Sequence, residues 1–238
     1  MKVHLLFEQS GVFKRAWMAN GYEAIDYDIN NDYGQTDVQV DIMHEIRNHY
    51  WQLRDTIFDD MATGDIVMAF FPCIYFSNWG NLNLHPRSRY KQSLDKESMW
   101  KGIIDRAVDR DQYLITLLQL IAICDQQSLP LIIENPWTGA QYLREALPWK
   151  PTLIDTNRAA HGDYYRKPTA YWFFGIEPKD AMPTTRRQYR STIEKAKKSS
   201  HRGMCSGERC EISQAYADAF VKWVILGQQQ SFLNPIFY

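Results

Sequence analysis

The apolar run from Ile66 to Phe71 constrains the fold of this chain more than any other stretch. It is followed directly by Pro72 and Cys73. A short, wholly apolar run of this kind predicts a strand that is buried on both faces of a sheet. Proline has no N–H group with which to continue a ladder, so the strand should end at Pro72. Cys73 is then expected at the carboxyl end of a central strand, where open α/β sheets bind their ligands.

Strand patterns alternate with helical patterns along the chain. Further strands are expected at residues 2–7, 23–29, 38–40, 130–134 and 167–175. Helices are expected at residues 12–20, 44–61, 94–127 and 213–226, with Ser213 as the N-cap of the last one. Residues 77–96 predict an irregular loop, and residues 144–151 a plain connection. This alternation favours a mostly parallel sheet with flanking helices, hence a single Rossmann-like α/β domain over residues 1–238.

The composition narrows the class of protein. With 45% hydrophobic and 23% charged residues, the chain resembles an ordinary globular domain. Its formal net charge of −1 gives no overall attraction to nucleic acid, so such a partner requires a local basic patch. Four cysteines do not make a disulfide framework in a chain of this size, and Cys205 and Cys210 lack the spacing of a zinc knuckle. Without signal-peptide flanks or a run of transmembrane length, we expect a reduced, cytoplasmic protein.

Polar residues stand at the ends of three predicted strands. They are Asp28, Cys73 and Glu134, and Asp41 follows a fourth, shorter strand. Because parallel strands present their carboxyl ends at one edge of a sheet, we expect these side chains to lie there together. A carboxylate after the second strand, beside the first turn, is placed to bind ribose hydroxyls. Taken alone, Asp28 also fits an ordinary turn or cap aspartate.

Cys73 and Glu134 together indicate a reaction. A thiolate is a strong nucleophile, and a nearby carboxylic acid can protonate the group that is attacked. The pair suits attack on an electron-poor ring whose nitrogen takes up a proton at the same moment. Each residue also has a plainer interpretation, which is a buried structural thiol for Cys73 and a strand-to-turn transition for Glu134.

The order of these pieces resembles the DNA cytosine-5 methyltransferase family, over nearly the whole chain. Phe71-Pro72-Cys73 resembles the loop that carries the nucleophile, and Glu134-Asn135-Pro136 resembles the Glu-Asn motif. Residues 165–169 resemble the late motif with a basic residue near the target base, and residues 208–213 resemble the last motif. The resemblance implies a class I methyltransferase fold. It also implies three catalytic residues, which are Cys73 as nucleophile, Glu134 as the acid that contacts the base, and Arg166 as the basic residue.

The same resemblance implies S-adenosylmethionine as the cofactor. Residues 7–11 resemble the first cofactor motif, Asp28 the ribose-binding acid, and Asp41-Ile42 the adenine-binding position. The implied cofactor-binding residues are Phe7, Glu8, Ser10, Gly11, Asp28, Ile29, Asp41, Ile42 and Pro72. The first motif has one glycine where the family has two or three, and Glu8 and Gln9 replace small residues. The methionine end of the pocket should therefore be more crowded or differently charged than in the family.

A short basic insert occupies residues 177–207, where family members carry a much larger target-recognition domain. Basic side chains can neutralise phosphates, although a run of charges is equally typical of a solvated loop. The residues expected to contact nucleic acid lie in this insert, in the loop after Cys73 and in the late motif. They are Arg87, Arg89, Lys167, Arg186, Arg187, Arg190, Lys197 and Lys198.

The resemblance implies methylation of cytosine C5 in DNA through a covalent Cys73 adduct, as in restriction–modification systems. The target base would have to leave the duplex, since its ring is not accessible inside the stack. Two alternatives stay open. One is modification of a free pyrimidine nucleotide or an RNA base, which needs no recognition domain. The other is a catalytically degenerate relative that binds nucleic acid or a partner protein. The oligomeric state, a homodimer included, is undecided.

Overall fold

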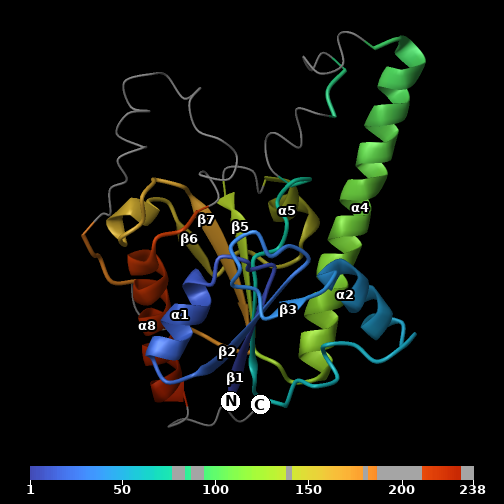
Figure 1. Cartoon of the computed structure of the whole chain (residues 1–238). Coiled ribbons are helices and arrows are strands. Elements are labelled where there is room, and N and C mark those ends of the chain that lie inside the picture. The colour runs from blue at the N-terminus through green and yellow to red at the C-terminus, as the bar shows by residue number, and fades with distance from the viewer. Residues whose placement is uncertain (77–83, 87–93, 138–140, 179–181, 187–210, 232–238) are drawn as a thin grey trace.

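The computed structural model describes residues 1–76, 84–86, 94–137, 141–178, 182–186 and 211–231. Within these ranges the chain forms a seven-stranded sheet with helices on both faces (Figure 1). The strands are β1 (Lys2–Leu6), β2 (Glu23–Asp28), β3 (Val38–Gln39), β4 (Ile66–Ala69), β5 (Leu131–Pro136), β6 (Leu153–Asp155) and β7 (Thr169–Phe174). No helix in the described part of the chain is long and apolar enough to cross a bilayer.

The strand order β3-β2-β1-β4-β5-β7-β6 places a switch point in the middle of the sheet. From β1 the chain builds outwards through β2 to β3, and it then returns to the other side of β1 as β4. Strands β1 to β5 pair in parallel, whereas β7 runs antiparallel to both neighbours. Where the order reverses, between β1 and β4, the loops diverge and leave a crevice at the carboxyl ends of the strands. The sheet is the mostly parallel, Rossmann-like one that the alternation predicts.

Helices cover both faces of the sheet. Helices α1 (Val12–Ala19) and α8 (Gln214–Ser231) lie side by side over one face, and α2 (Ile42–Tyr50) and α4 (Lys96–Gln126) lie over the other (Figure 1). In β4, Ile66 and Met68 pack into the core under α1 and α8, while Val67 and Ala69 pack into the core under α2 and α4. The prediction that the opening run is a strand buried on both faces is confirmed.

The prediction of a helix at residues 44–61 is wrong in its second half, because α2 ends at Tyr50. Gln52 has a positive φ of 53°, which an α-helix cannot continue through. The carboxylate of Glu45 on α2 accepts a hydrogen bond from the N–H of Ile57 at 3.1 Å. The chain after the helix therefore folds back onto it.

Three short elements are not predicted by the sequence: α5 (Gln141–Ala146), β6 and a 3₁₀ turn. Helix α5 runs into the stretch 144–151, and β6 follows that stretch. β6 is too short to show a periodic pattern, and its pairing with β7 defines it, with Leu153 opposite Tyr171 and Asp155 opposite Thr169. A partner distant in sequence, rather than a local signal, makes this strand. A single 3₁₀ turn, η3 (Arg158–Ala160), connects β6 towards β7.

Candidate active site

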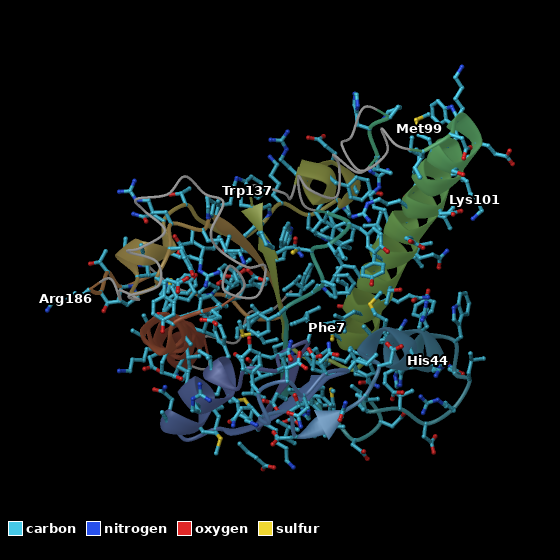
Figure 2. The ribbon with its side chains drawn as sticks, turned by 45° about the horizontal axis from the view of Figure 1, so that its top comes forward. Phe7, His44, Met99, Lys101, Trp137 and Arg186 are labelled. Carbon is cyan, nitrogen blue, oxygen red and sulfur yellow. The ribbon has the colours of Figure 1, made fainter. Side chains whose placement is uncertain are left out.

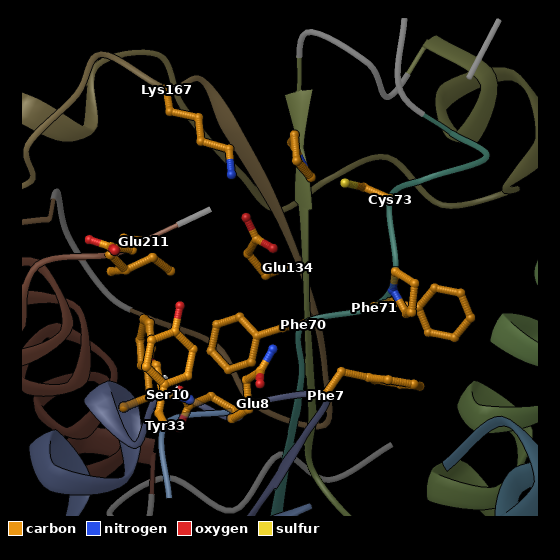
Figure 3. A pocket seen from close by; sticks show the side chains of 15 residues that line it. Phe7, Glu8, Ser10, Tyr33, Phe70, Phe71, Cys73, Glu134, Lys167 and Glu211 are labelled. Carbon is orange, nitrogen blue, oxygen red and sulfur yellow. Dashed lines mark hydrogen bonds between the residues drawn. The ribbon is translucent and has the colours of Figure 1, made fainter. Parts of the chain in front are cut away.

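The carboxyl ends of β1, β4 and β5 surround a cavity of about 250 Å³. Glu8 follows β1, Cys73 follows β4, and Glu134 lies in β5 (Figure 3). Lys167, just before β7, also lines the cavity. The remaining lining residues are Phe7, Gln9, Ser10, Phe13, Tyr33, Phe70, Phe71, Pro72, Pro136, Glu211 and Ile212. The structure thus brings Cys73 and Glu134 to one cavity, as expected for residues at the ends of neighbouring strands.

A buried amide fixes the cysteine-bearing segment against the glutamate-bearing strand. The Nδ2 group of Asn135 donates a hydrogen bond to the carbonyl of Phe71 at 2.9 Å. Asn135 follows Glu134 in β5, and Phe71 precedes Pro72-Cys73, so this bond links the strand that carries Glu134 to the segment that carries Cys73. Cys73 is only partly buried, and its thiol points towards the cavity (Figure 3).

Glu134 is held in a state that favours the protonated acid. Its side chain is 7% exposed, and no described residue donates a hydrogen bond to its carboxyl group. Burial raises its pKa, while the positive charges of Lys167 and Arg158 offset part of that rise. A raised pKa favours the protonated form of the carboxyl group, from which a proton can pass to a ligand in the cavity.

Of the two basic residues in the late motif, Lys167 rather than Arg166 lines the cavity. The Lys167 side chain reaches in from the segment before β7 and points its Nζ towards Glu134 (Figure 3). The Arg166 side chain is exposed and is not among the lining residues. The cation nearest Glu134 in this motif is therefore Lys167.

The loop after β1 forms one end of the cavity. Phe7 has a φ of 61° and Gly11 a φ of 65°, so the backbone turns sharply at both ends of the loop. A Cβ atom on Gly11 would lie 3.1 Å from the guanidinium of Arg15 and 3.2 Å from Gln35, so both side chains would have to shift, and the positive φ itself favours glycine. The hydroxyl of Ser10 accepts the N–H of Val12 at 3.3 Å, at the start of α1. The single glycine of the first motif thus sits where the turn requires it.

A second cavity, of about 420 Å³, adjoins the first and shares Phe7 and Pro72 with it. Four residues from the predicted cofactor set line it with Pro72: Phe7, Ile29, Asp41 and Ile42. The sequence gives no signal for its other lining residues, which come from α2 and from the middle of α4. They are Met43, Arg47, Asp109, Gln112 and Tyr113. The predicted cofactor residues therefore fall into two adjacent cavities, with Glu8 and Ser10 in the first.

Two predicted cofactor residues, Asp28 and Gly11, line neither cavity. The carboxylate of Asp28 accepts the N–H of Asn30 at 2.8 Å in a turn, and burial raises its pKa. Asp41 is the N-cap of α2, since its carboxylate accepts the N–H of His44 at 3.1 Å, and it also lines the second cavity. The turn interpretation of Asp28 is thus correct as a structural role, and the capping role of Asp41 was not predicted.

Sequence reasoning missed several residues of the first cavity. Phe13 comes from α1, Tyr33 from the loop after β2, and Phe70 from the end of β4. Glu211 and Ile212 belong to the stretch that resembles the last motif, which was the one signal that could have found them. Tyr33 has no local signal, because only the fold brings its loop to this edge.

The residues expected to contact nucleic acid are mostly beyond the described ranges. Arg186 is exposed and lies at the outer edge of the molecule, well away from Phe7 (Figure 2). Lys167 lies in the cavity instead of on a surface patch. The other six lie outside the described residues: Arg87, Arg89, Arg187, Arg190, Lys197 and Lys198.

A buried polar network lies behind Glu134. The guanidinium of Arg158 is fully buried and pairs with Asp163 at 2.5 Å. It lies 4.6 Å from the ring centre of Tyr216, whose hydroxyl is 2.9 Å from that of Tyr171. Tyr171 stands opposite Glu134 in the β5–β7 ladder. The network places a fixed positive charge near the buried acid.

The chain matches no protein-family model and no curated protein. Among the described residues, no group of three or more His, Cys, Asp or Glu side chains is placed to hold a metal ion. The candidate site therefore rests on its own geometry, which combines a thiol, a buried acid and a lysine at the switch point of the sheet.

Proposed function

We propose that the protein methylates C5 of cytosine in DNA through a covalent adduct with Cys73. The observation that carries this proposal is the placement of Cys73, Glu134 and Lys167 around one cavity at the switch point of a Rossmann-like sheet. The adjoining second cavity supports a class I methyltransferase arrangement, because residues predicted to bind the cofactor line it.

In this proposal Cys73 and Glu134 act on the pyrimidine ring together. The thiolate of Cys73 attacks C6, and the π electrons displaced from C5=C6 make C5 nucleophilic as Glu134 gives its proton to N3. Lys167 stabilises the carboxylate that remains, since its charge favours the ionised form of Glu134. After C5 has been alkylated, a base removes the C5 proton, and C5=C6 re-forms as the Sγ–C6 bond breaks. The thiolate of Cys73 is released and the N3 proton returns to Glu134.

The cofactor S-adenosylmethionine supplies the electrophilic methyl group when it is bound. The second cavity would hold its adenine ring, with apolar surface from Phe7, Ile29, Ile42 and Tyr113 and an acceptor from Asp41. Glu8 and Ser10 line the first cavity, where the amino-acid end would lie beside Cys73. A target base would enter the same cavity from the side of Lys167 and would have to be flipped out of a duplex, at a cost of a few kcal/mol.

The test is adduct formation with DNA that contains 5-fluorocytosine, since fluorine at C5 blocks the final elimination. In the presence of S-adenosylmethionine we expect a denaturation-resistant protein–DNA species, and none with Cys73→Ser. Cys124→Ser is the matched control, because Cys124 is a buried thiol on α4 whose pKa burial raises to about 12, so it is inert. Methyl transfer by a folded Cys73→Ser protein would contradict the proposal.

A free pyrimidine nucleotide is a second candidate substrate. The chain between β7 and α8, residues 175–213, is too short to hold a separate recognition domain with its own core. We therefore include 5-fluoro-dCMP beside the DNA. Adduct formation with the nucleotide alone would assign the same chemistry to the smaller substrate.

A further inference from the structure

Glu8 carries a buried carboxylate oxygen with no donor in the described part of the chain. The Glu8 side chain is 5% exposed and lines the first cavity. Its Oε1 accepts the N–H of Ser10 at 3.0 Å and the hydroxyl of the same residue. Its Oε2 has no hydrogen-bond partner. A buried carboxylate oxygen left unpaired costs free energy, so its persistence in a cavity points to a donor that arrives with a ligand.

Gln9 repeats this feature on the next residue. Its side-chain oxygen is also buried, without a donor among the described residues, and Gln9 lines the same cavity. Two consecutive loop residues thus present acceptor atoms without donors. One orphaned atom can be a packing accident, whereas an adjacent pair in one cavity fits a single ligand group that has several N–H bonds.

The surroundings of the pair favour a cation. Burial raises the pKa of Glu8, and the nearby Asp26 raises it further. The cationic side chains of α1 are already engaged, Lys14 with Asp26 and Asp37, and Arg15 with Gln214. Lys167 is the one cation among the described lining residues, and it lies at the other end of the cavity from Glu8 (Figure 3).

We propose that Glu8 and Gln9 bind the α-ammonium group at the amino-acid end of the cofactor. An ammonium group has three donors and no acceptor, so it can satisfy both oxygens and neutralise the carboxylate at once. The rings of Phe13, Tyr33 and Phe70 line the same cavity and suit the neighbouring positive sulfonium, which has no N–H to donate. The two residues that depart from the family pattern thereby become the determinants of cofactor specificity. This inference rests on the proposed function.

The experiment is calorimetry on the full chain with two nucleosides that differ at this end. S-adenosylhomocysteine carries the α-ammonium group, and 5′-methylthioadenosine lacks the whole amino-acid end. Glu8→Gln should weaken binding of the first by about 10- to 100-fold, the range for a charge-assisted hydrogen bond in a buried site. It should leave the affinity for 5′-methylthioadenosine unchanged. Gln9→Met, which removes an acceptor and keeps the shape, should weaken S-adenosylhomocysteine by about 10-fold.

The control is Glu23→Gln, which makes the same change of charge on an exposed glutamate that pairs with Lys2 at the amino ends of the strands. It should bind both nucleosides as the unchanged protein does. Thermal melting without ligand separates binding from folding, because Glu8→Gln removes a desolvated charge and should melt no lower than the unchanged protein. Should Glu8→Gln not fold, Gln9→Met alone decides, since it leaves the charge in place.

The outcomes are distinct. If the unchanged protein binds neither nucleoside at about 1 mM, the proposed function fails and this inference fails with it. If Glu8→Gln weakens the binding of both nucleosides equally, Glu8 only shapes the loop. The inference is then wrong, and the proposed function stands. Unchanged affinity for S-adenosylhomocysteine in both variants would also reject the inference, while the proposed function would stand.

Discussion

At the scale of single residues, the carboxylates near the strand ends differ by their surroundings. The carboxylate of Asp28 accepts a hydrogen bond from a backbone N–H in a turn. No described residue donates a hydrogen bond to the carboxyl group of Glu134. Burial raises the pKa of both groups. Asp28 therefore stabilises its own loop, whereas the hydrogen-bonding capacity of the Glu134 carboxyl group is not used by any described residue.

Glu134→Gln should make stability less dependent on pH. Burial raises the pKa of Glu134 above its ordinary value of 4.5, so the native state holds a proton that the unfolded state releases. The unfolded state then binds fewer protons, and the free energy of unfolding falls as the pH rises from about 4.5 towards the native pKa. Glutamine does not titrate, so it adds no such pH dependence to the free energy of unfolding. We expect Glu134→Gln to unfold at higher urea concentration than the unchanged protein at pH 8.

The same comparison at pH 4 provides the internal control. Below the unfolded pKa both states of Glu134 are protonated, so the advantage of Glu134→Gln should shrink to a small, constant difference. An advantage of equal size at pH 4 and pH 8 would mean that glutamine stabilises the site by packing or hydrogen bonding. The pKa of Glu134 would then not be raised.

A sequence reveals candidate site residues at the ends of regular strands more readily than those in loops. The sequence indicates Cys73 and Glu134 because each stands at or just after the end of an apolar run, and the order of strands brings both to one edge. Arg166 and Lys167 could not be told apart, because the direction of a side chain outside a regular strand is set by packing. Tyr33 was missed, since a loop residue has no periodic signal. Glu8 stands out in the sequence only as a departure from a pattern, and the structure adds that its Oε2 atom is buried without a donor among the described residues.

At the scale of elements, the turn after η3 meets the start of α8 at a very tight point. Ser213 accepts the N–H of Tyr216 at 3.1 Å, which confirms it as the N-cap of α8, and its hydroxyl donates to the carbonyl of Gly162 at 2.6 Å. Gly162 has a φ of 101°, a backbone conformation that residues with a side chain rarely adopt. The glycine therefore lets the β6–β7 connection approach the last helix closely enough to share one hydroxyl.

Gly162→Ala should lower the free energy of unfolding by about 2 kcal/mol, from backbone strain and overpacking. A Cβ atom there would lie 2.8 Å from the Cγ2 atom of Thr185 and 3.2 Å from the Cβ atom of Ala215. Urea unfolding followed by circular dichroism measures the change. Gly102→Ala in α4 is the matched control, because nothing lies within 4 Å of its Cβ and alanine should stabilise the helix by up to about 1 kcal/mol. A gain in stability for both variants would contradict the prediction that a Cβ atom at Gly162 is overpacked and strained.

Most of the helices and strands follow from a periodic or wholly apolar pattern in the sequence. The predicted bounds lie within five residues of the observed ones for α1, α4 and α8, and for β1 to β5 and β7. β6 and the end of α2 are not predicted, because tertiary pairing defines the first and a positive φ at Gln52 ends the second. Local propensity does not contain either piece of information.

At the scale of the whole molecule, the buried network joins parts of the chain that are distant in sequence. Arg158 lies in η3, Asp163 follows it, and Tyr171 and Tyr216 come from β7 and α8. The second carboxylate oxygen of Asp163, Oδ1, accepts the N–H of Ser213 at 3.0 Å. The network thus ties the antiparallel edge of the sheet to the helix that closes its face. The same edge carries the segment with Lys167.

Asp163→Asn should be severely destabilising, by about 3–5 kcal/mol, because it leaves the fully buried charge of Arg158 without its counter-ion. Replacing both partners, as in Arg158→Met with Asp163→Leu, should recover much of this loss, because neither buried charge then remains. The free energy of unfolding from urea titration measures both changes.

Asp105→Asn is the control for this prediction, since it breaks the exposed pair of Lys101 and Asp105, 2.9 Å apart on α4, and should change stability by less than about 0.5 kcal/mol. Similar losses for Asp163→Asn and Asp105→Asn would contradict the view that burial makes the Arg158 pair decisive. A double variant that is no more stable than Asp163→Asn would show that pairing of the two charges is not the main stabilising interaction of Asp163. The hydrogen bond from Ser213 to Asp163, rather than charge neutralisation, would then hold the edge of the sheet to α8.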